Sequence, residues 1–197
     1  MKLKALLSSL LLAGIIFLNA DRSSAETFRE GSNVISGGLG FGSALAGSLS
    51  YGSQSPGLAL SFEHGMWEVG GPGAISLGGY LGYKSYKYSV SGVSGGVIYN
   101  YTQKWSYTII GLRSAYHYNG FTDEKFDPYG GLMLSYDIFG HSISGDNSGV
   151  VNIKGNSEVF LSAFFGARYY FADNLAVYGE IGYGVAFFTV GLSYNIQ

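Results

Sequence analysis

The C-terminal stretch FTVGLSYNI, residues 188–196, alternates strictly between large apolar and small or polar side chains. One parity holds Phe188, Val190, Leu192, Tyr194 and Ile196, and the other holds Thr189, Gly191, Ser193 and Asn195. Successive side chains of a β-strand point to opposite faces of the sheet. A period of two therefore predicts a strand with one apolar face.

The same alternation recurs upstream and predicts further strands. The segments lie near residues 33–43, 57–67, 74–87, 105–117, 128–139, 158–171, 175–184 and 187–196. Their lengths are near the 9 to 11 residues that a tilted strand needs to cross a bilayer. Short and long connectors alternate except at the short last connector, as is typical of outer-membrane barrels. We therefore predict an all-β fold: an eight-stranded antiparallel up-and-down meander closed into a transmembrane barrel.

Composition narrows the classes of function. The 197 residues include 32 Gly, 17 Tyr, 13 Phe and 2 Trp, only 12% are charged, and none is Cys. The lack of Cys excludes a disulfide scaffold and thiolate sites. A net charge of −2 with scattered Lys and Arg argues against a nucleic-acid partner, which would need a basic face.

The first 25 residues predict a signal peptide. Lys2 and Lys4 precede an apolar run over residues 5–18, and Ser23-Ser24-Ala25 supplies the small residues of a cleavage site. The alternative is a single anchoring helix, which needs about 20 apolar residues. We expect residues 1–25 to be removed on export and residues 26–197 to form the barrel domain.

The two parities differ in a way that indicates which face points inward. In a soluble barrel the apolar parity would fill the inside. Here the other parity holds Gly, Ser, Thr and Tyr with few charges, which suits the narrow interior of an eight-stranded barrel better than a water-exposed surface. We expect the apolar parity to face lipid and the lumen to be filled. The expected lumen charges are Arg168, Glu180, Arg113 and Glu63.

The turn at Asp173 and Asn174 predicts a register for the strands beside it. A three-residue loop centred on Asn174 would place Arg168 directly opposite Glu180, both on the inward parity. We therefore expect an ion pair between these two side chains inside the barrel. The alternative is that both head groups reach interfacial water near the periplasmic mouth, where such a pair contributes little.

One stretch resembles a known family. The segment GARYYFADNLAVYGE, residues 166–180, followed by Gly182-Tyr183-Gly184 and a last alternating strand, resembles the final hairpins of small Gram-negative outer-membrane barrels of the OmpA and OmpX type. The resemblance implies a location in the outer membrane, with outer-membrane lipid as a partner. It also implies biogenesis through periplasmic chaperones and the barrel assembly machinery. The family usually ends in an aromatic residue, whereas this chain ends Ile196-Gln197.

Few residue types suggest catalysis. His141 with Ser142 or Ser144 and Asp146 is the one arrangement that could serve a lipid-acting rim enzyme, although polar residues of a solvated loop are the favoured interpretation. The three His residues are scattered, so we expect no metal site, no cofactor and no enzymatic activity.

A connector supplies the candidate for surface binding. The segment Ser89 to Tyr101 is rich in Ser, Gly, Tyr and Asn, a mixture typical of binding surfaces and also of plain soluble loops. Its candidate binding residues are Tyr99, Asn100 and Tyr101. Three hypotheses follow: a structural or surface-interaction barrel, which is favoured, a narrow conduit for small or apolar ligands, and a lipid-acting enzyme.

Overall fold

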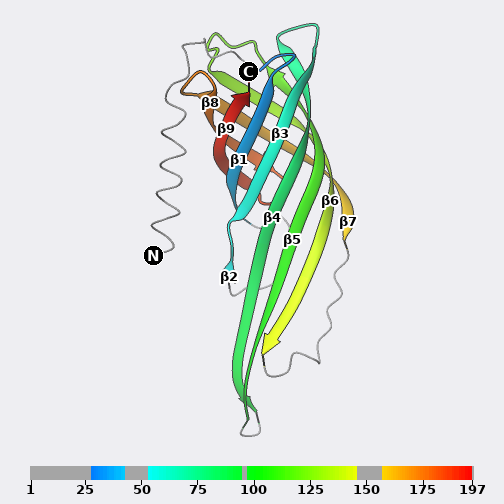
Figure 1. Ribbon diagram of the computed structural model, residues 1–197, viewed down its shortest axis with the longest axis vertical. Coiled ribbons are helices and arrows are strands. Elements are labelled where there is room, and N and C mark those ends of the chain that lie inside the picture. The colour runs from blue at the N-terminus through cyan, green and yellow to red at the C-terminus, as the bar shows by residue number, and fades with distance from the viewer. Residues whose placement is uncertain (1–27, 43–52, 95–96, 146–156, 197) are drawn as a thin grey trace.

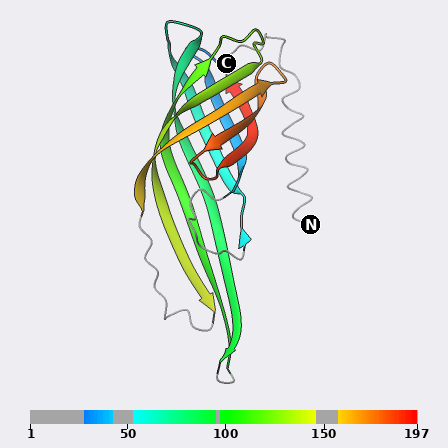
Figure 2. The same cartoon turned by 180° about the vertical axis from the view of Figure 1, so that it is seen from behind.

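Long antiparallel strands wind into a closed barrel (Figure 1; seen from behind in Figure 2). The computed structural model describes residues 28–42, 53–94, 97–145 and 157–196. The strands within these residues are β1 (Asn33–Phe41), β2 (Ser53–Gln54), β3 (Gly57–Glu68), β4 (Gly73–Ser94), β5 (Val97–Tyr118), β6 (Phe126–Gly145), β7 (Glu158–Tyr170), β8 (Leu175–Gly182) and β9 (Phe188–Ile196). No helix in this part of the chain is both long and apolar enough to span a membrane.

The barrel is closed by pairing between its first and last strands. Each long strand pairs with the next along the chain, and β1 pairs with β9 from Asn33↔Ile196 to Phe41↔Phe188. The two-residue β2 pairs with β4 outside this ring. Closure leaves none of the eight barrel strands with a free edge at the level of the ring. The predicted all-β, eight-stranded meander is confirmed.

Three strands are longer than predicted. The β4–β5 hairpin stays paired out to Ser94↔Val97, and β6 continues to Gly145. The prediction of a loop over Ser89 to Tyr101 is therefore wrong, because strand continues on both sides of residues 95–96. Polar residues on both parities resemble a loop in the sequence, but a strand outside the membrane can be polar on both faces.

The extended parts of β4, β5 and β6 form a blade, which we define as residues 84–94, 97–107 and 139–145. The blade projects beyond the barrel at the end opposite the C-terminus (Figures 1 and 2). The short connections after β3, β5 and β7 lie at the other end, which is the end of the C-terminus.

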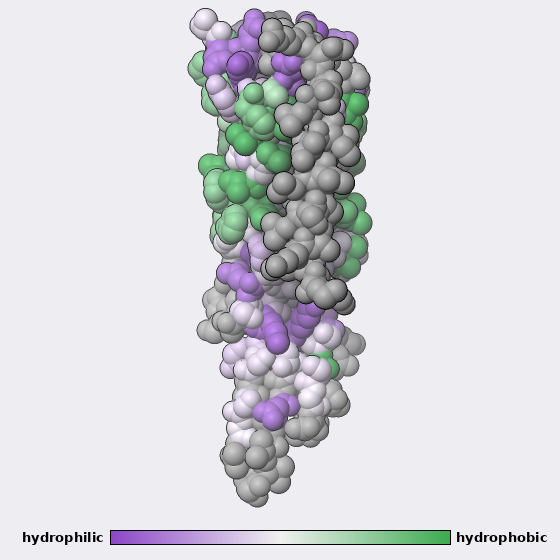
Figure 3. All heavy atoms as spheres, turned by 60° about the vertical axis from the view of Figure 1, so that its left-hand side comes forward, coloured by the Kyte–Doolittle hydropathy of each residue, from purple (hydrophilic) through white to green (hydrophobic). Residues whose placement is uncertain are grey.

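Side-chain burial follows the predicted parity. On β9 the exposed side chains include Phe188, Leu192 and Ile196, whereas Thr189 and Ser193 are buried. On the face seen in Figure 3, hydrophobic residues gather in a band across the barrel, with hydrophilic residues above and below it. This surface is inverted relative to that of a soluble barrel.

Glycines beside aromatic rings fill the inside. A Cβ at Gly166 would lie 2.6 Å from the ring of Tyr129, so only Gly leaves room for that inward aromatic side chain. Further toward the blade, a cavity between Tyr80, Met133 and Phe164 measures only about 10 Å³. Such a volume holds about one water molecule.

Candidate functional site

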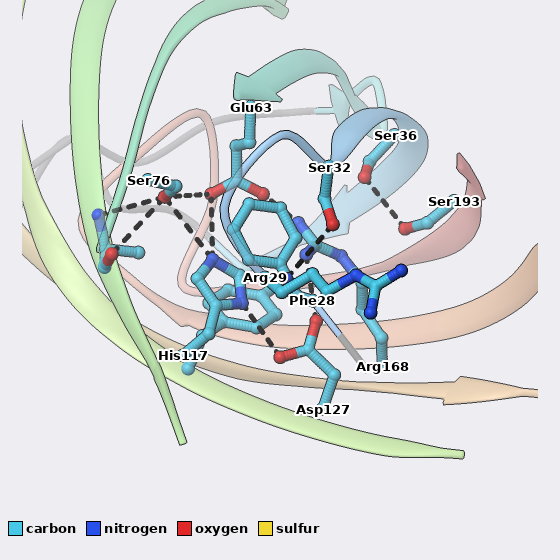
Figure 4. A network of polar contacts seen from close by, with 12 residues as sticks. Phe28, Arg29, Ser32, Ser36, Glu63, Ser76, His117, Asp127, Arg168 and Ser193 are labelled. Carbon is cyan, nitrogen blue, oxygen red and sulfur yellow. Dashed lines mark hydrogen bonds and ion pairs between the residues drawn. The ribbon is translucent and has the colours of Figure 1, made fainter. Parts of the chain in front are cut away.

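Charged side chains from five strands meet inside the barrel, near the end that carries the short turns. We call them the lumen network: Glu63 (β3), Arg113 and His117 (β5), Asp127 (β6), Arg168 (β7) and Glu180 (β8). All stand on the inward parity of their strands. Figure 4 shows Glu63, His117, Asp127 and Arg168 pointing toward one another.

Arg168 joins two carboxylates. Its Nη1 donates to Asp127 Oδ2 at 3.0 Å, and its Nη2 donates to Glu63 Oε2. All three side chains are at most 1% exposed. The guanidinium also lies 4.6 Å from the centre of the Tyr129 ring. A charge buried this deeply is costly unless it is paired, so these contacts hold β3, β6 and β7 in one arrangement.

Arg113 is the second cation of the lumen network. Its Nη2 lies 2.7 Å from Glu180 Oε2, and its Nε lies 3.5 Å from Glu63 Oε1. The guanidinium carbon of Arg113 lies 3.8 Å from the centre of the Phe164 ring, which packs against it. The Tyr129 hydroxyl donates to the same Glu180 oxygen at 3.2 Å. Glu63 thus faces both arginines and links the two halves of the network.

His117 completes the lumen network on the side nearest the short turns. Its Nδ1 lies 2.8 Å from Asp127 Oδ1, and its Nε2 lies 3.3 Å from Ser76 Oγ. The ring is fully buried. The network therefore combines two guanidinium groups, three carboxylates and one imidazole, and its opposite charges largely offset one another.

The segment before β1 closes this end of the barrel. Phe28 is fully buried, and its ring stacks on His117 with 3.8 Å between centres. Asn119 Nδ2 donates to the Phe28 carbonyl at 2.8 Å, and Gly31 N donates to Gly65 O at 2.9 Å. We call residues 28–32 the plug segment. Sequence reasoning missed it because a single aromatic residue outside any alternating stretch gives no periodic signal.

The structure brings the four expected lumen charges together, but with different partners. Arg168 contacts Glu63, while Glu180 contacts Arg113. The predicted Arg168–Glu180 pair is wrong, since the strands pair as Arg168↔Tyr178 and Gly166↔Glu180. The register differs by two residues because the turn is centred on Asp173, not Asn174. A two-residue shift keeps every side chain on its own face, so polarity could not reveal it.

The residues considered for catalysis are separated. His141 lies on the inner face of β6, with its ring 5.8 Å from that of Trp105 and 6.5 Å from that of Phe139. Ser142 and Ser144 face the opposite side, in a groove with Lys104. Asp146 lies outside the described residues. Within the described ranges, no three His, Asp or Glu side chains are placed to hold a metal ion.

The candidate surface-binding residues fall on the blade. Tyr99, Asn100 and Tyr101 belong to β5, where they pair with Gly92, Ser91 and Val90. Asn100 is exposed. The side chains of Tyr99 and Tyr101 lie outside the described part of the structure.

An antiparallel eight-stranded barrel with an apolar outside and a polar, filled inside defines the class of outer-membrane β-barrels. Among solved structures, the chain is similar to one described as the crystal structure of Ail, the attachment invasion locus protein of Yersinia pestis, in complex with the heparin analogue sucrose octasulfate. That match has a TM-score of 0.46 and 13% identity, and it covers 85% of this chain and 99% of that one. No family model and no curated protein matches the chain.

Proposed function

We propose that this protein is a non-enzymatic barrel of the bacterial outer membrane that acts at the cell surface through its blade. The observation that carries the proposal is a closed barrel whose outside is apolar and whose lumen is occupied by side chains. Such a barrel suits lipid on the outside and has no room for a substrate within. Its remaining surface for a partner is the part that leaves the membrane.

The positions of the turns support an orientation. Outer-membrane barrels have short turns on the periplasmic side and longer connections outside the cell. The turns after β3, β5 and β7 would therefore face the periplasm, and the blade would face outward. This orientation fits export by a signal peptide over residues 1–25, followed by insertion with periplasmic chaperones and the barrel assembly machinery.

We assign a structural role to the lumen charges Arg168, Glu180, Arg113 and Glu63. Their contacts link strands that are far apart around the ring, since Glu63 on β3 faces Arg168 on β7 and Arg113 on β5. Together with the plug segment they would seal the periplasmic end.

The blade offers a surface for an extracellular partner. It extends the β4–β5 hairpin well past the apolar band, and Tyr99, Asn100 and Tyr101 lie close to its tip. Backbone hydrogen bonds between its strands give the blade a fixed shape. It therefore loses less conformational entropy on binding a partner than a free loop would, which favours a specific contact.

Two measurements on cells test the proposal. The protein should be found in purified outer membrane and should migrate differently on gels before and after heating, as folded barrels do. Bacteria carrying a trimmed chain, in which an Asn-Gly turn replaces residues 90–101, should adhere less to host cells or matrix than bacteria carrying the intact chain. A chain with Asp123→Asn, at the opposite end, serves as the control.

Recovery of the protein in the inner membrane would overturn the proposed location. Equal adhesion by the trimmed and intact chains, at equal surface amounts, would overturn the role of the blade.

A further inference from the structure

The outward face of the blade changes character in regular layers. The last layer of the barrel that carries large, exposed hydrophobic side chains holds Tyr83, Thr108 and Ile138, which are register partners on β4, β5 and β6. The next layer is Ser85, Ser106 and Gly140, and the one beyond it is Lys87, Lys104 and Ser142. On β4 the outward face thus passes from Tyr83 through Ser85 to Lys87 within four residues, and on β5 it passes from Thr108 through Ser106 to Lys104.

The two lysines stand directly opposite each other. Lys87 pairs with Lys104, and Ser53 of β2 and Ser142 of β6 flank them, so one row crosses four strands. Directly opposed residues of an antiparallel pair have Cβ atoms about 5 Å apart, and like charges there are destabilising. Among the described residues, no carboxylate forms a salt bridge with either lysine.

A groove lies over this row. Its volume is about 470 Å³, and it has polar side chains along it. The lining residues are Ser53, Gln54, Ser55, Ser85, Lys87, Thr102, Lys104, Ser142 and Ser144. No Asp or Glu is among them, so hydrogen-bond donors and two positive charges face the groove. An oxyanion with several acceptor atoms matches this set of groups.

The height of the groove indicates the source of the anion. Lys87 is four residues beyond Tyr83, which corresponds to about 13 Å along a strand and about 10 Å along the axis of a tilted barrel. Lysine side chains near a membrane boundary reach back toward the interface. The ammonium groups therefore lie level with lipid headgroups, if the apolar band spans the membrane as proposed above.

We propose that the groove over Lys87 and Lys104 binds the phosphate of a lipid headgroup in the outward-facing leaflet. A phosphate between the two ammonium groups removes their mutual repulsion and accepts hydrogen bonds from the serine hydroxyls beside them. The site fixes the height of the barrel in the membrane and anchors the base of the blade. It rests on the proposed membrane location but does not depend on adhesion by the blade.

Native mass spectrometry of the purified full chain, released from dodecyl maltoside micelles, tests the site. The probes are a lipid A that carries two phosphates and its fully dephosphorylated counterpart. We expect the phosphorylated lipid to bind at least tenfold more tightly. The double variant Lys87→Gln, Lys104→Gln should bring the two affinities within about twofold. Replacement of both lysines by Arg should keep the preference, because the positive charges remain.

The control is Lys125→Gln, which removes an exposed lysine at the opposite end of the barrel. It should bind like the unaltered chain. No preference for the phosphorylated lipid, or an equal preference in the double Gln variant, would overturn the site. Full displacement of lipid A by an equimolar amount of inorganic phosphate would overturn the assignment to a headgroup, because the lipid would then add nothing to the affinity. Normal heat-dependent migration together with no lipid preference would contradict the phosphate site and leave the proposed location intact.

Discussion

At the scale of single residues, Arg168 supports the lumen network most directly. Its guanidinium joins Glu63 and Asp127, which are otherwise buried carboxylates on different strands. Replacing it by Met leaves both negative charges without this cation. Removing one partner of a buried ion pair typically costs about 3 to 5 kcal/mol. We expect a loss of that size in the free energy of unfolding of Arg168→Met, measured by urea unfolding in lipid vesicles.

A double-mutant cycle separates the observed partners from the predicted ones. Arg168→Met and Glu63→Gln should couple by about 1 to 3 kcal/mol, as expected for residues in contact. Arg168→Met and Glu180→Gln should couple less, because Glu180 contacts Arg113. A stronger coupling of Arg168 to Glu180 than to Glu63 would contradict the register. Lys125→Met, at an exposed position, should change stability by less than about 0.5 kcal/mol.

The sequence predicts which charged side chains face inward but not which of them form ion pairs. Alternation assigned Arg168 and Glu63 to the inward parity, and both lie inside. It could not assign partners, because a two-residue slip preserves parity, and pairs such as Glu63 with Arg168 join strands that are not neighbours. Asp127 and His117 were missed for a related reason: each lies at a strand end, where the alternating pattern is weakest.

Among the elements of the fold, the plug segment closes the end of the barrel that carries the short turns, and a substitution at Phe28 tests this role. Phe28 is fully buried against His117, and its carbonyl is held by Asn119. Replacement of a buried Phe by Ala usually costs about 3 to 5 kcal/mol. We expect Phe28→Ala to lower the free energy of unfolding by this amount in urea titrations.

Phe121, in the turn after β5, is 52% exposed and provides the matched control. Phe121→Ala should cost less than about 1 kcal/mol. Similar losses at the two positions would mean that Phe28 does not seal the barrel.

A second experiment tests whether the barrel folds without the outer part of the blade. Trimming residues 90–101 removes strand that pairs only within the blade, and Ser89↔Thr102 remains to close the shorter hairpin. Hairpin length has only a weak effect on the cost of closing the chain. We expect the trimmed chain to keep its heat-dependent migration and a Tm within about 4 °C of the intact chain.

Failure of the trimmed chain to fold would show that the blade is needed to form the barrel.

The blade is also the element that the sequence did not predict. Its sequence has Tyr, Ser and Gly on both parities, so no apolar face distinguishes a strand from a loop. In the structure, cross-strand pairing makes this segment a strand.

Over the whole molecule, the barrel is closed, its outer face is apolar and its lumen is filled. The number of strands and the two faces could be predicted because alternation in the sequence reports directly on which side chains meet lipid. The filled lumen follows from geometry, since eight strands leave a bore only as wide as side chains. Tyr80, Phe164 and Arg113 occupy it around a cavity of about 10 Å³.

Electrical recording from planar lipid bilayers that contain the pure, folded protein tests whether the lumen is filled. We predict no stable conductance above that of the bare bilayer, because neither ions nor small solutes can pass the lumen network and the aromatic side chains between it and the blade. Stable, large conductance steps from the unaltered chain would contradict the filled lumen and would favour a conduit instead.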